Sequence, residues 1–203
     1  MSHKATSKPK LRRTPHEEVG PMYPVKKPAD RGYDLTINPA NGQRAAGQIL
    51  YLSGRVIDTN GKPIVAAMVE LWQTNEHGRY KHPADPNPAQ LDENFDGWGF
   101  AITDAEGSWK FKTIKPAAYP ASAPGWWRPP HIHFDVTTDY CRMCTQMYFP
   151  GEPLNDKDLL ISRHRALGDG ELIVAKPTPL PAGAEPDAIA LTFDVVVNAR
   201  LTD

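Results

Sequence analysis

Hydrophobic and polar residues alternate along this 203-residue chain over short stretches, and no long helical period is seen. Several stretches have a period of two, which is typical of half-buried β-strands. They are separated by 21 prolines and 15 glycines, and by turn signals at Asn60-Gly61 and Glu106-Gly107. This pattern predicts strands over residues 49–58, 66–73, 99–103, 107–114, 131–138, 144–149 and 188–197.

Helices contribute little to the predicted fold. Only residues 155–168 have the character of a short helix, and no stretch has a long, capped amphipathic pattern. Many short strands with frequent turns predict an all-β fold, an antiparallel β-sandwich with long loops and few short helices. We see no internal repeat and no low-complexity linker, so we expect a single domain over residues 20–203.

The charges of the chain nearly cancel, with 23 Lys and Arg against 24 Asp and Glu. Such a balance gives no field that would attract nucleic acid. Basic residues gather in the first thirteen positions, and we expect residues 1–19 to form a flexible, solvated tail. Because no apolar run reaches spanning length and no hydrophobic signal opens the chain, we expect a cytoplasmic protein without membrane contact.

The chain has two cysteines, Cys141 and Cys144, in a C-R-M-C arrangement. Two cysteines cannot form a disulfide framework, and one such pair supplies only half of a tetrahedral zinc site. The pair also falls where a strand is predicted, not at the start of a helix that would activate a redox thiol. We therefore interpret both as core thiols.

The segment Arg-Pro-Pro-His-Ile-His-Phe at residues 128–134 carries the first chemical signal. On a strand, Ile132 and Phe134 would face the core, while His131 and His133 would lie side by side on the opposite face. Such a pair can hold one metal ion, although two histidines with ordinary hydrogen bonds have the same pattern. Neutral imidazole binds iron, zinc and copper alike, so the pair does not name the metal.

From about Gly20 to Val197, the chain resembles the intradiol ring-cleavage dioxygenases, and within them the iron-carrying subunit of protocatechuate 3,4-dioxygenase. The resemblance rests on a series of motifs that occur in the family's order and at its spacings. They are LSGRVID-x-x-GKP, VELWQTNEHGRYKH, LDENFDGWG, TDAEGSWKFKTIKP, Tyr119-Pro120, WRPPHIHF and TQMYFPGEP.

The resemblance implies one ferric ion, Fe(III), held by Tyr80, Tyr119, His131 and His133. Tyr119 matches the axial tyrosine that leaves the iron when substrate binds, and Tyr80 matches the equatorial one that stays. A free tyrosine has a pKa of about 10, so only a strongly Lewis-acidic ion would keep two of them deprotonated at neutral pH. Two phenolates and one hydroxide would neutralise Fe(III).

The activity that the resemblance implies is cleavage of a catechol-type ring by dioxygen between its two hydroxyl-bearing carbons, giving a cis,cis-muconate. The substrate is then a small aromatic diol, with a protocatechuate-like ring favoured and other catechols or hydroxyquinol left open. Arg128 matches an arginine beside the substrate ring, where it would stabilise developing negative charge. Gln146 matches a glutamine near the iron that orients its neighbours.

The resemblance also implies which residues line the substrate pocket. Trp72 and Leu160 match positions that line the substrate cavity. Ala121 departs from the protocatechuate enzymes, which carry a tryptophan there, so we expect room for a larger or differently substituted ring. His77 and His82 flank Tyr80 but are expected to be solvated rather than ligating.

Two alternatives remain, the first within enzymes and the second from another class of protein. A zinc hydrolase would use His131, His133 and a carboxylate, with water in the open position. A transthyretin-like or adhesin-type sandwich would only bind a partner, since this fold hosts many functions. For the assembly we expect a homo-oligomer, with a second, iron-free subunit type left open.

Overall fold

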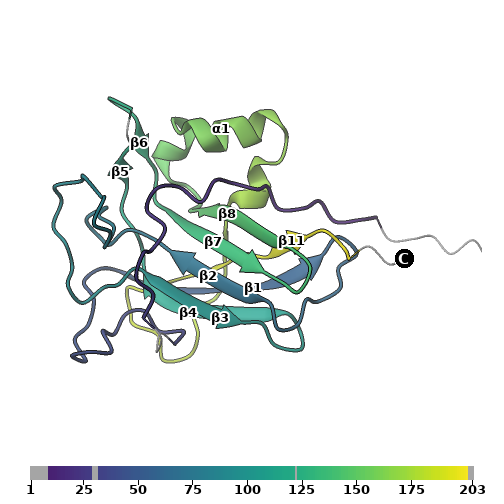
Figure 1. Ribbon diagram of the computed structural model, residues 1–203, viewed down its shortest axis with the longest axis horizontal. Coiled ribbons are helices and arrows are strands. Elements are labelled where there is room, and N and C mark those ends of the chain that lie inside the picture. Colours follow the sequence, from purple (N-terminus) through teal and green to yellow (C-terminus); the bar gives the residue numbers. More distant parts are fainter. Residues whose placement is uncertain (1–8, 29–31, 122, 201–203) are drawn as a thin grey trace, which may run out of the picture.

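Two packed β-sheets form the body of the protein, and its short helices lie together beside one of them (Figure 1). A computed structural model describes residues 9–28, 32–121 and 123–200, and it confirms the predicted all-β class. The helices are α1 (Leu159–Ala166) and the 3₁₀ helices η1 (Pro153–Asp156) and η2 (Gly170–Ile173). The strands are β1 (Ile49–Asp58), β2 (Met68–Trp72), β3 (Trp98–Ile102), β4 (Ser108–Ile114), β5 (Tyr119–Pro120), β6 (Trp127–Arg128), β7 (His131–Thr137), β8 (Arg142–Tyr148), β9 (Lys176–Pro177), β10 (Ile189–Thr192) and β11 (Val195–Val197).

One sheet has the strand order β3-β2-β7-β8, with every neighbouring pair antiparallel. The other has the order β11-β1-β10-β9, and β4 pairs with β1. Strands β5 and β6 form a separate antiparallel hairpin. The predicted strand over residues 188–197 is in fact two strands, β10 and β11, and both pair with β1 in parallel.

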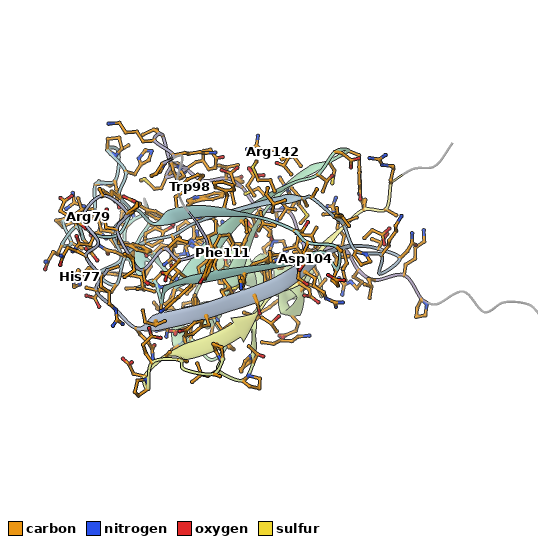
Figure 2. All side chains as sticks on the ribbon, turned by 90° about the horizontal axis from the view of Figure 1, so that it is seen from below. His77, Arg79, Trp98, Asp104, Phe111 and Arg142 are labelled. Atoms are coloured by element: carbon orange, nitrogen blue, oxygen red, sulfur yellow. The ribbon has the colours of Figure 1, made fainter. Side chains whose placement is uncertain are left out.

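The hydrophobic core lies between the two sheets, and Figure 2 shows Phe111 there. On β7, Ile132, Phe134 and Val136 are fully buried in this core, as the period of two predicts. His131 and His133 point to the other face of the same strand, yet both are also buried. That outer face is therefore covered as well.

A segment near the N-terminus supplies part of the cover. Backbone N–H groups of Leu11, Thr14 and Glu17 donate to carbonyls of the sandwich at 2.8 to 3.0 Å, and the last of these carbonyls is on β8. Thr14 and Glu17 are buried. The solvated tail predicted over residues 1–19 therefore does not hold at Thr14 and Glu17, whereas Arg12 and Arg13 are exposed, and residues 1–8 lie outside the described part of the chain.

Helix α1 falls within the predicted helical segment and packs beside β8, where Ile161 and Ile173 form a small cluster with Tyr148. Among the described residues, no helix has both the length and the apolar character needed to cross a membrane. Cys141 and Cys144 are both free; Cys144 is buried, and Cys141 is partly buried and packs against the core.

Candidate metal centre and active site

Strand β7 places the two histidines and their neighbours. His131 lies opposite Tyr148 of β8, and His133 lies opposite Gln146. Cross-strand partners point to the same face of a sheet, so all four side chains gather on the outer side of this sheet. On its other flank, His133 lies opposite Trp72 of β2, and the two rings stack at 4.8 Å with an interplanar angle of 10°.

Tyr80 reaches the histidines from the long loop between β2 and β3. Its backbone N–H donates to Asp85 Oδ2 at 2.7 Å, a contact within the same loop. Gly78 has φ +78°, and a Cβ there would lie 2.3 Å from the carbonyl oxygen of Ala118. Only glycine permits this close approach. It brings the loop of Tyr80 against the segment that carries Tyr119.

Tyr119 and Arg128 are paired residues across the β5–β6 hairpin. The short hairpin therefore delivers both side chains to the same place, next to the start of β7. Arg128 is buried and its guanidinium carbon lies 5.6 Å from the centre of the Trp126 ring. Tyr119 is half-buried, whereas Tyr80 is buried, so Tyr119 is the more accessible of the two tyrosines.

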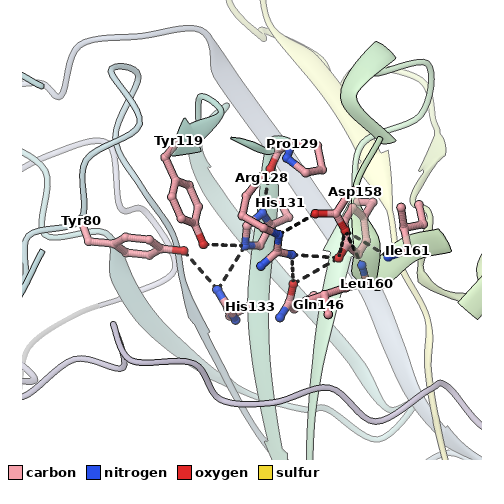
Figure 3. A network of polar contacts seen from close by, with 11 residues as sticks. Tyr80, Tyr119, Arg128, Pro129, His131, His133, Gln146, Asp158, Leu160 and Ile161 are labelled. Atoms are coloured by element: carbon pink, nitrogen blue, oxygen red, sulfur yellow. Dashed lines mark hydrogen bonds and ion pairs between the residues drawn. The ribbon is translucent and has the colours of Figure 1, made fainter. Parts of the chain in front are cut away.

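Four donor atoms converge at this point (Figure 3). Nε2 of His131 and Nε2 of His133 are 3.2 Å apart. The hydroxyl of Tyr80 is 3.1 Å from Nε2 of His133, and that of Tyr119 is 3.4 Å from Nε2 of His131. The rings of Tyr80 and Tyr119 meet edge to face at 5.4 Å. The structure thus brings together the four side chains that the family resemblance implies as ligands.

The histidines are neutral and one has a defined tautomer. Nδ1 of His131 lies 2.7 Å from the carbonyl oxygen of Pro129, which can only accept, so Nδ1 carries the proton and Nε2 has a free lone pair. Burial, with the positive charge of Arg128, lowers the pKa of His131 well below its usual value and that of His133 to about 3. Neutral imidazole is the form that binds metals.

Burial has the opposite consequence for the tyrosines. It raises the pKa of Tyr119, and it raises that of Tyr80 well above the ordinary value. The protein alone therefore keeps both as phenols. Their deprotonation requires a strongly charged ion beside the two oxygens.

The donor set fits a single metal ion. Neighbouring ligands with bonds of about 2.1 Å at about 90° lie about 3 Å apart, and the contacts found here are 3.1 to 3.4 Å. In the described part of the chain, no three His, Cys, Asp or Glu side chains are grouped to hold a metal. The carboxylate that a zinc hydrolase would need therefore does not join the histidines.

Arg128 occupies the centre of a buried polar network (Figure 3). Its Nε donates to Asp158 Oδ2 at 2.8 Å, and its Nη2 donates to Gln146 Oε1 at 2.6 Å and to the Tyr148 hydroxyl at 2.9 Å. Burial alone would lower the pKa of this guanidinium, but Tyr148, Tyr119 and Asp158 outweigh it and raise that pKa. Nη1 makes no hydrogen bond to any residue that the structure describes.

The remaining predicted residues lie around this centre at different depths. Trp72 is almost fully buried behind the His133 ring. Leu160 and Ala121 are partly exposed, the first in α1 and the second just after β5. His77 is exposed and lies at one end of the molecule with Arg79, and His82 is partly exposed (Figure 2).

Sequence reasoning missed two residues of the network, Asp158 and Tyr148. Tyr148 was within reach, because it lies two positions after Gln146 on a predicted strand and shares its face. Asp158 lies inside the predicted helical segment 155–168, and the structure shows that it caps the helix that begins at Leu159. No pattern in the sequence pairs it with Arg128. A second buried cluster, in which His164 lies between Glu17 and Asp169, joins α1 to the N-terminal segment.

The sequence profile of a family described as dioxygenase matches residues 19–199. Protocatechuate 3,4-dioxygenase beta chain from Burkholderia cepacia is 40% identical over 187 residues, which cover 91% of this chain and 79% of that protein. Catechol 1,2-dioxygenase from Acinetobacter baylyi is 32% identical over 204 residues, covering 94% of this chain and 63% of the relative. The chain thus spans somewhat less than two thirds of this second relative.

Solved structures show the same fold. The dioxygenase domain of a carbohydrate-binding fusion protein from Streptomyces sp. SirexAA-E matches with a TM-score of 0.67 and 25% identity, over 93% of this chain and 100% of that one. Catechol 1,2-dioxygenase from Acinetobacter sp. ADP1 matches with a TM-score of 0.67 and 26% identity, over 93% and 63% of the two chains. This chain belongs to the intradiol ring-cleaving dioxygenases, a family of enzymes.

Proposed function

We propose that this protein is a non-haem Fe(III) dioxygenase that cleaves a catechol-type ring between its two hydroxyl-bearing carbons. The observation that carries the proposal is the convergence of two neutral imidazoles and two phenols, joined by three successive contacts of 3.1 to 3.4 Å, in a chain of this family. Tyr80, Tyr119, His131 and His133 would hold the ion. When bound, ferric iron supplies Lewis acidity and a template for the diol and dioxygen.

The two tyrosines have different tasks in this proposal. The Tyr80 hydroxyl is buried against His133, which suits a permanent ligand. The Tyr119 hydroxyl has a longer contact, 3.4 Å, and a more accessible side chain. As a phenolate, Tyr119 can take a proton from a substrate hydroxyl at its own oxygen, and it acts as the general base for binding.

Arg128 presents a fixed positive charge to the substrate. Its Nε and Nη2 atoms make three hydrogen bonds to protein groups. Nη1 is therefore the nitrogen that can donate to a ligand. A donor held in advance beside the ring oxygens stabilises negative charge that develops during cleavage. Gln146, at 2.6 Å from Nη2, keeps the guanidinium in place.

The substrate is a small aromatic diol. We place protocatechuate first because the relative at 40% identity is named for it, and catechol and hydroxyquinol follow because other relatives act on them. Trp72 supports the His133 side of the site, and Leu160 and Ala121 are proposed walls. We expect a homo-oligomer. The relative at 40% identity is named a beta chain, so an assembly with a second type of subunit is the alternative.

The test is the product. The iron-loaded protein is incubated with protocatechuate, catechol or hydroxyquinol under ¹⁸O₂, and the products are identified by mass spectrometry and NMR. The proposal predicts a cis,cis-muconate that contains both atoms of one dioxygen, formed from at least one of the three. A ring-opened semialdehyde, or no product from any substrate by iron-loaded protein, would contradict it.

A further inference from the structure

Asp158 has two tasks, and each is carried mainly by one carboxylate oxygen, although Oδ1 also accepts from the Tyr148 hydroxyl at 3.3 Å. Oδ1 accepts the backbone N–H groups of Leu160 at 3.1 Å and Ile161 at 3.0 Å, and it thereby caps the N-terminus of α1. Oδ2 accepts from Nε of Arg128 at 2.8 Å. The side chain has no exposed surface. One residue therefore joins a helix to the arginine of the active site.

The capping task alone does not explain an aspartate at this position. Serine or asparagine caps a helix about as well as aspartate. A fully buried carboxylate costs desolvation energy that a neutral cap avoids, and this cost is offset only by a well-aligned partner. Arg128 is that partner, with a side chain that is only 7% exposed.

The bond to Nε determines where the rest of the guanidinium points. A guanidinium is planar and its donors have a rigid arrangement, so anchoring Nε and Nη2 fixes the direction of Nη1. Gln146 and Tyr148 hold Nη2, and Asp158 holds Nε. Without Asp158, the side chain can rotate about the remaining contacts, and Nη1 loses its fixed direction.

We propose that Asp158 is a positioning residue. It directs Nη1 of Arg128 toward the substrate and holds the guanidinium in a fixed position relative to helix α1. The inference rests on the proposed function, because it assigns Nη1 of Arg128 to the bound diol. It also couples two sides of the site, since α1 carries Leu160, a proposed wall of the pocket. A shift of the helix and a shift of the arginine would then occur together.

Substitutions at Asp158 separate capping from positioning. Asp158→Ser and Asp158→Asn keep an oxygen for the helix cap but lose the carboxylate that pairs with Arg128, and Asp158→Ala loses both. We expect the first two variants to bind iron with the visible spectrum of the wild type, and to lose about 10- to 100-fold in kcat with little change in anaerobic substrate affinity. If Asp158 only capped α1, both would keep the wild-type kcat.

A matched control lies two residues earlier. Asp156 forms an ion pair with Arg165 at 2.7 Å, and its side chain is 77% exposed. Asp156→Asn also removes one negative charge, at the last residue of η1, but Asp156 pairs with Arg165 and not with Arg128. Its kcat should equal that of the wild type.

A double-mutant cycle with Arg128→Gln tests whether Asp158 acts through the arginine. Adding Asp158→Asn to Arg128→Gln should cost no further kcat, because the group to be positioned is already absent. A full, multiplied loss in the double variant would overturn the proposal. The double variant also removes both buried charges, so it remains measurable if a single variant does not fold.

Crystal structures of the wild type and Asp158→Asn give a readout that does not depend on turnover. The guanidinium should leave its position beside Gln146 in the variant, and an unmoved guanidinium with unchanged kcat would overturn the proposal. An inactive wild type would instead refute the proposed dioxygenase function. The two failures are therefore distinguishable.

Discussion

Tyr119→Phe tests the two tyrosine roles most sharply. The phenylalanine ring keeps the packing of Tyr119 against Tyr80 at 5.4 Å and against His131 at 5.5 Å. Only the hydroxyl is lost, and its contact with Nε2 of His131 is a long one, 3.4 Å. We therefore expect the free energy of unfolding to change by less than about 1 kcal/mol.

The effect on catalysis should be far larger. Loss of a positioned general base costs typically about 10²- to 10⁴-fold in rate, which corresponds to about 3 to 5 kcal/mol in the barrier. Iron should remain bound through Tyr80, His131 and His133, but its visible absorption band should shift because one tyrosinate is gone. Tyr80 is the buried, permanent ligand in this proposal. Tyr80→Phe should therefore lose more iron than Tyr119→Phe.

The assay combines three measurements on each variant: iron content, the visible spectrum and kcat with the best substrate. Tyr140→Phe is a suitable control, because the Tyr140 hydroxyl donates to the carbonyl of Asn198, outside the site, at 3.0 Å. It should leave all three values unchanged. An unaltered band and an unaltered kcat in Tyr119→Phe would refute the assignment of Tyr119 as ligand and base.

Three further predictions concern the ligands, a surface ion pair and the core. His131→Ala and His133→Ala should each lose most of the iron in metal analysis, and full occupancy in both would be incompatible with the site. The ammonium of Lys112 and other hydrogen bonds lower the pKa of Glu185 to about 2, so its stabilising effect is complete above about pH 4.5 and is lost as the pH falls through 2. Glu185→Gln should therefore destabilise the protein by about 0.5 to 1 kcal/mol at pH 7 in urea unfolding, and its difference from the wild type should become smaller as the pH falls from 4.5 toward 2. Phe134→Ala should cost about 3 to 5 kcal/mol in the same assay, because Phe134 is fully buried, and a loss below 1 kcal/mol would show that the core is not packed as described.

The sequence predicted the strands well because their faces have contrasting environments. Ile132 and Phe134 alternate with His131 and His133, and the period of two is visible without any other information. It could not reveal that the outer face is also buried, because that burial comes from distant segments. The basic residues near the N-terminus suggested a solvated tail, yet Thr14 and Glu17 are buried against the sandwich.

Parallel pairing of β10 and β11 with β1 was also beyond the sequence pattern. An apolar run over residues 188–197 predicts a strand but not its partner or its interruption. The interruption follows from a close crossing, in which a Cβ on Gly54 would lie 1.9 Å from the carbonyl oxygen of Phe193. Such a contact between distant segments leaves no local period in the sequence.

In the candidate site, too, the local pattern predicts some residues, and others come together only through contacts between distant segments. His131 and His133 share one strand, so their proximity follows from strand geometry. Tyr80 lies in the loop between β2 and β3 and Tyr119 lies in the β5–β6 hairpin, and only their resemblance to a family pattern pointed to them. Asp158 shows the limit most clearly, because its cap is a local signal while its bond to Arg128 joins residues 30 positions apart.

The central claim is that four side chains hold one ferric ion that binds a catechol directly. The most direct measurement is the visible spectrum of the purified, iron-loaded protein, with metal analysis, before and after anaerobic addition of catechol, protocatechuate and hydroxyquinol. We predict a red-brown protein with one iron per chain and a band that shifts with at least one of the three. A protein that takes up no iron and stays colourless after reconstitution would contradict the account.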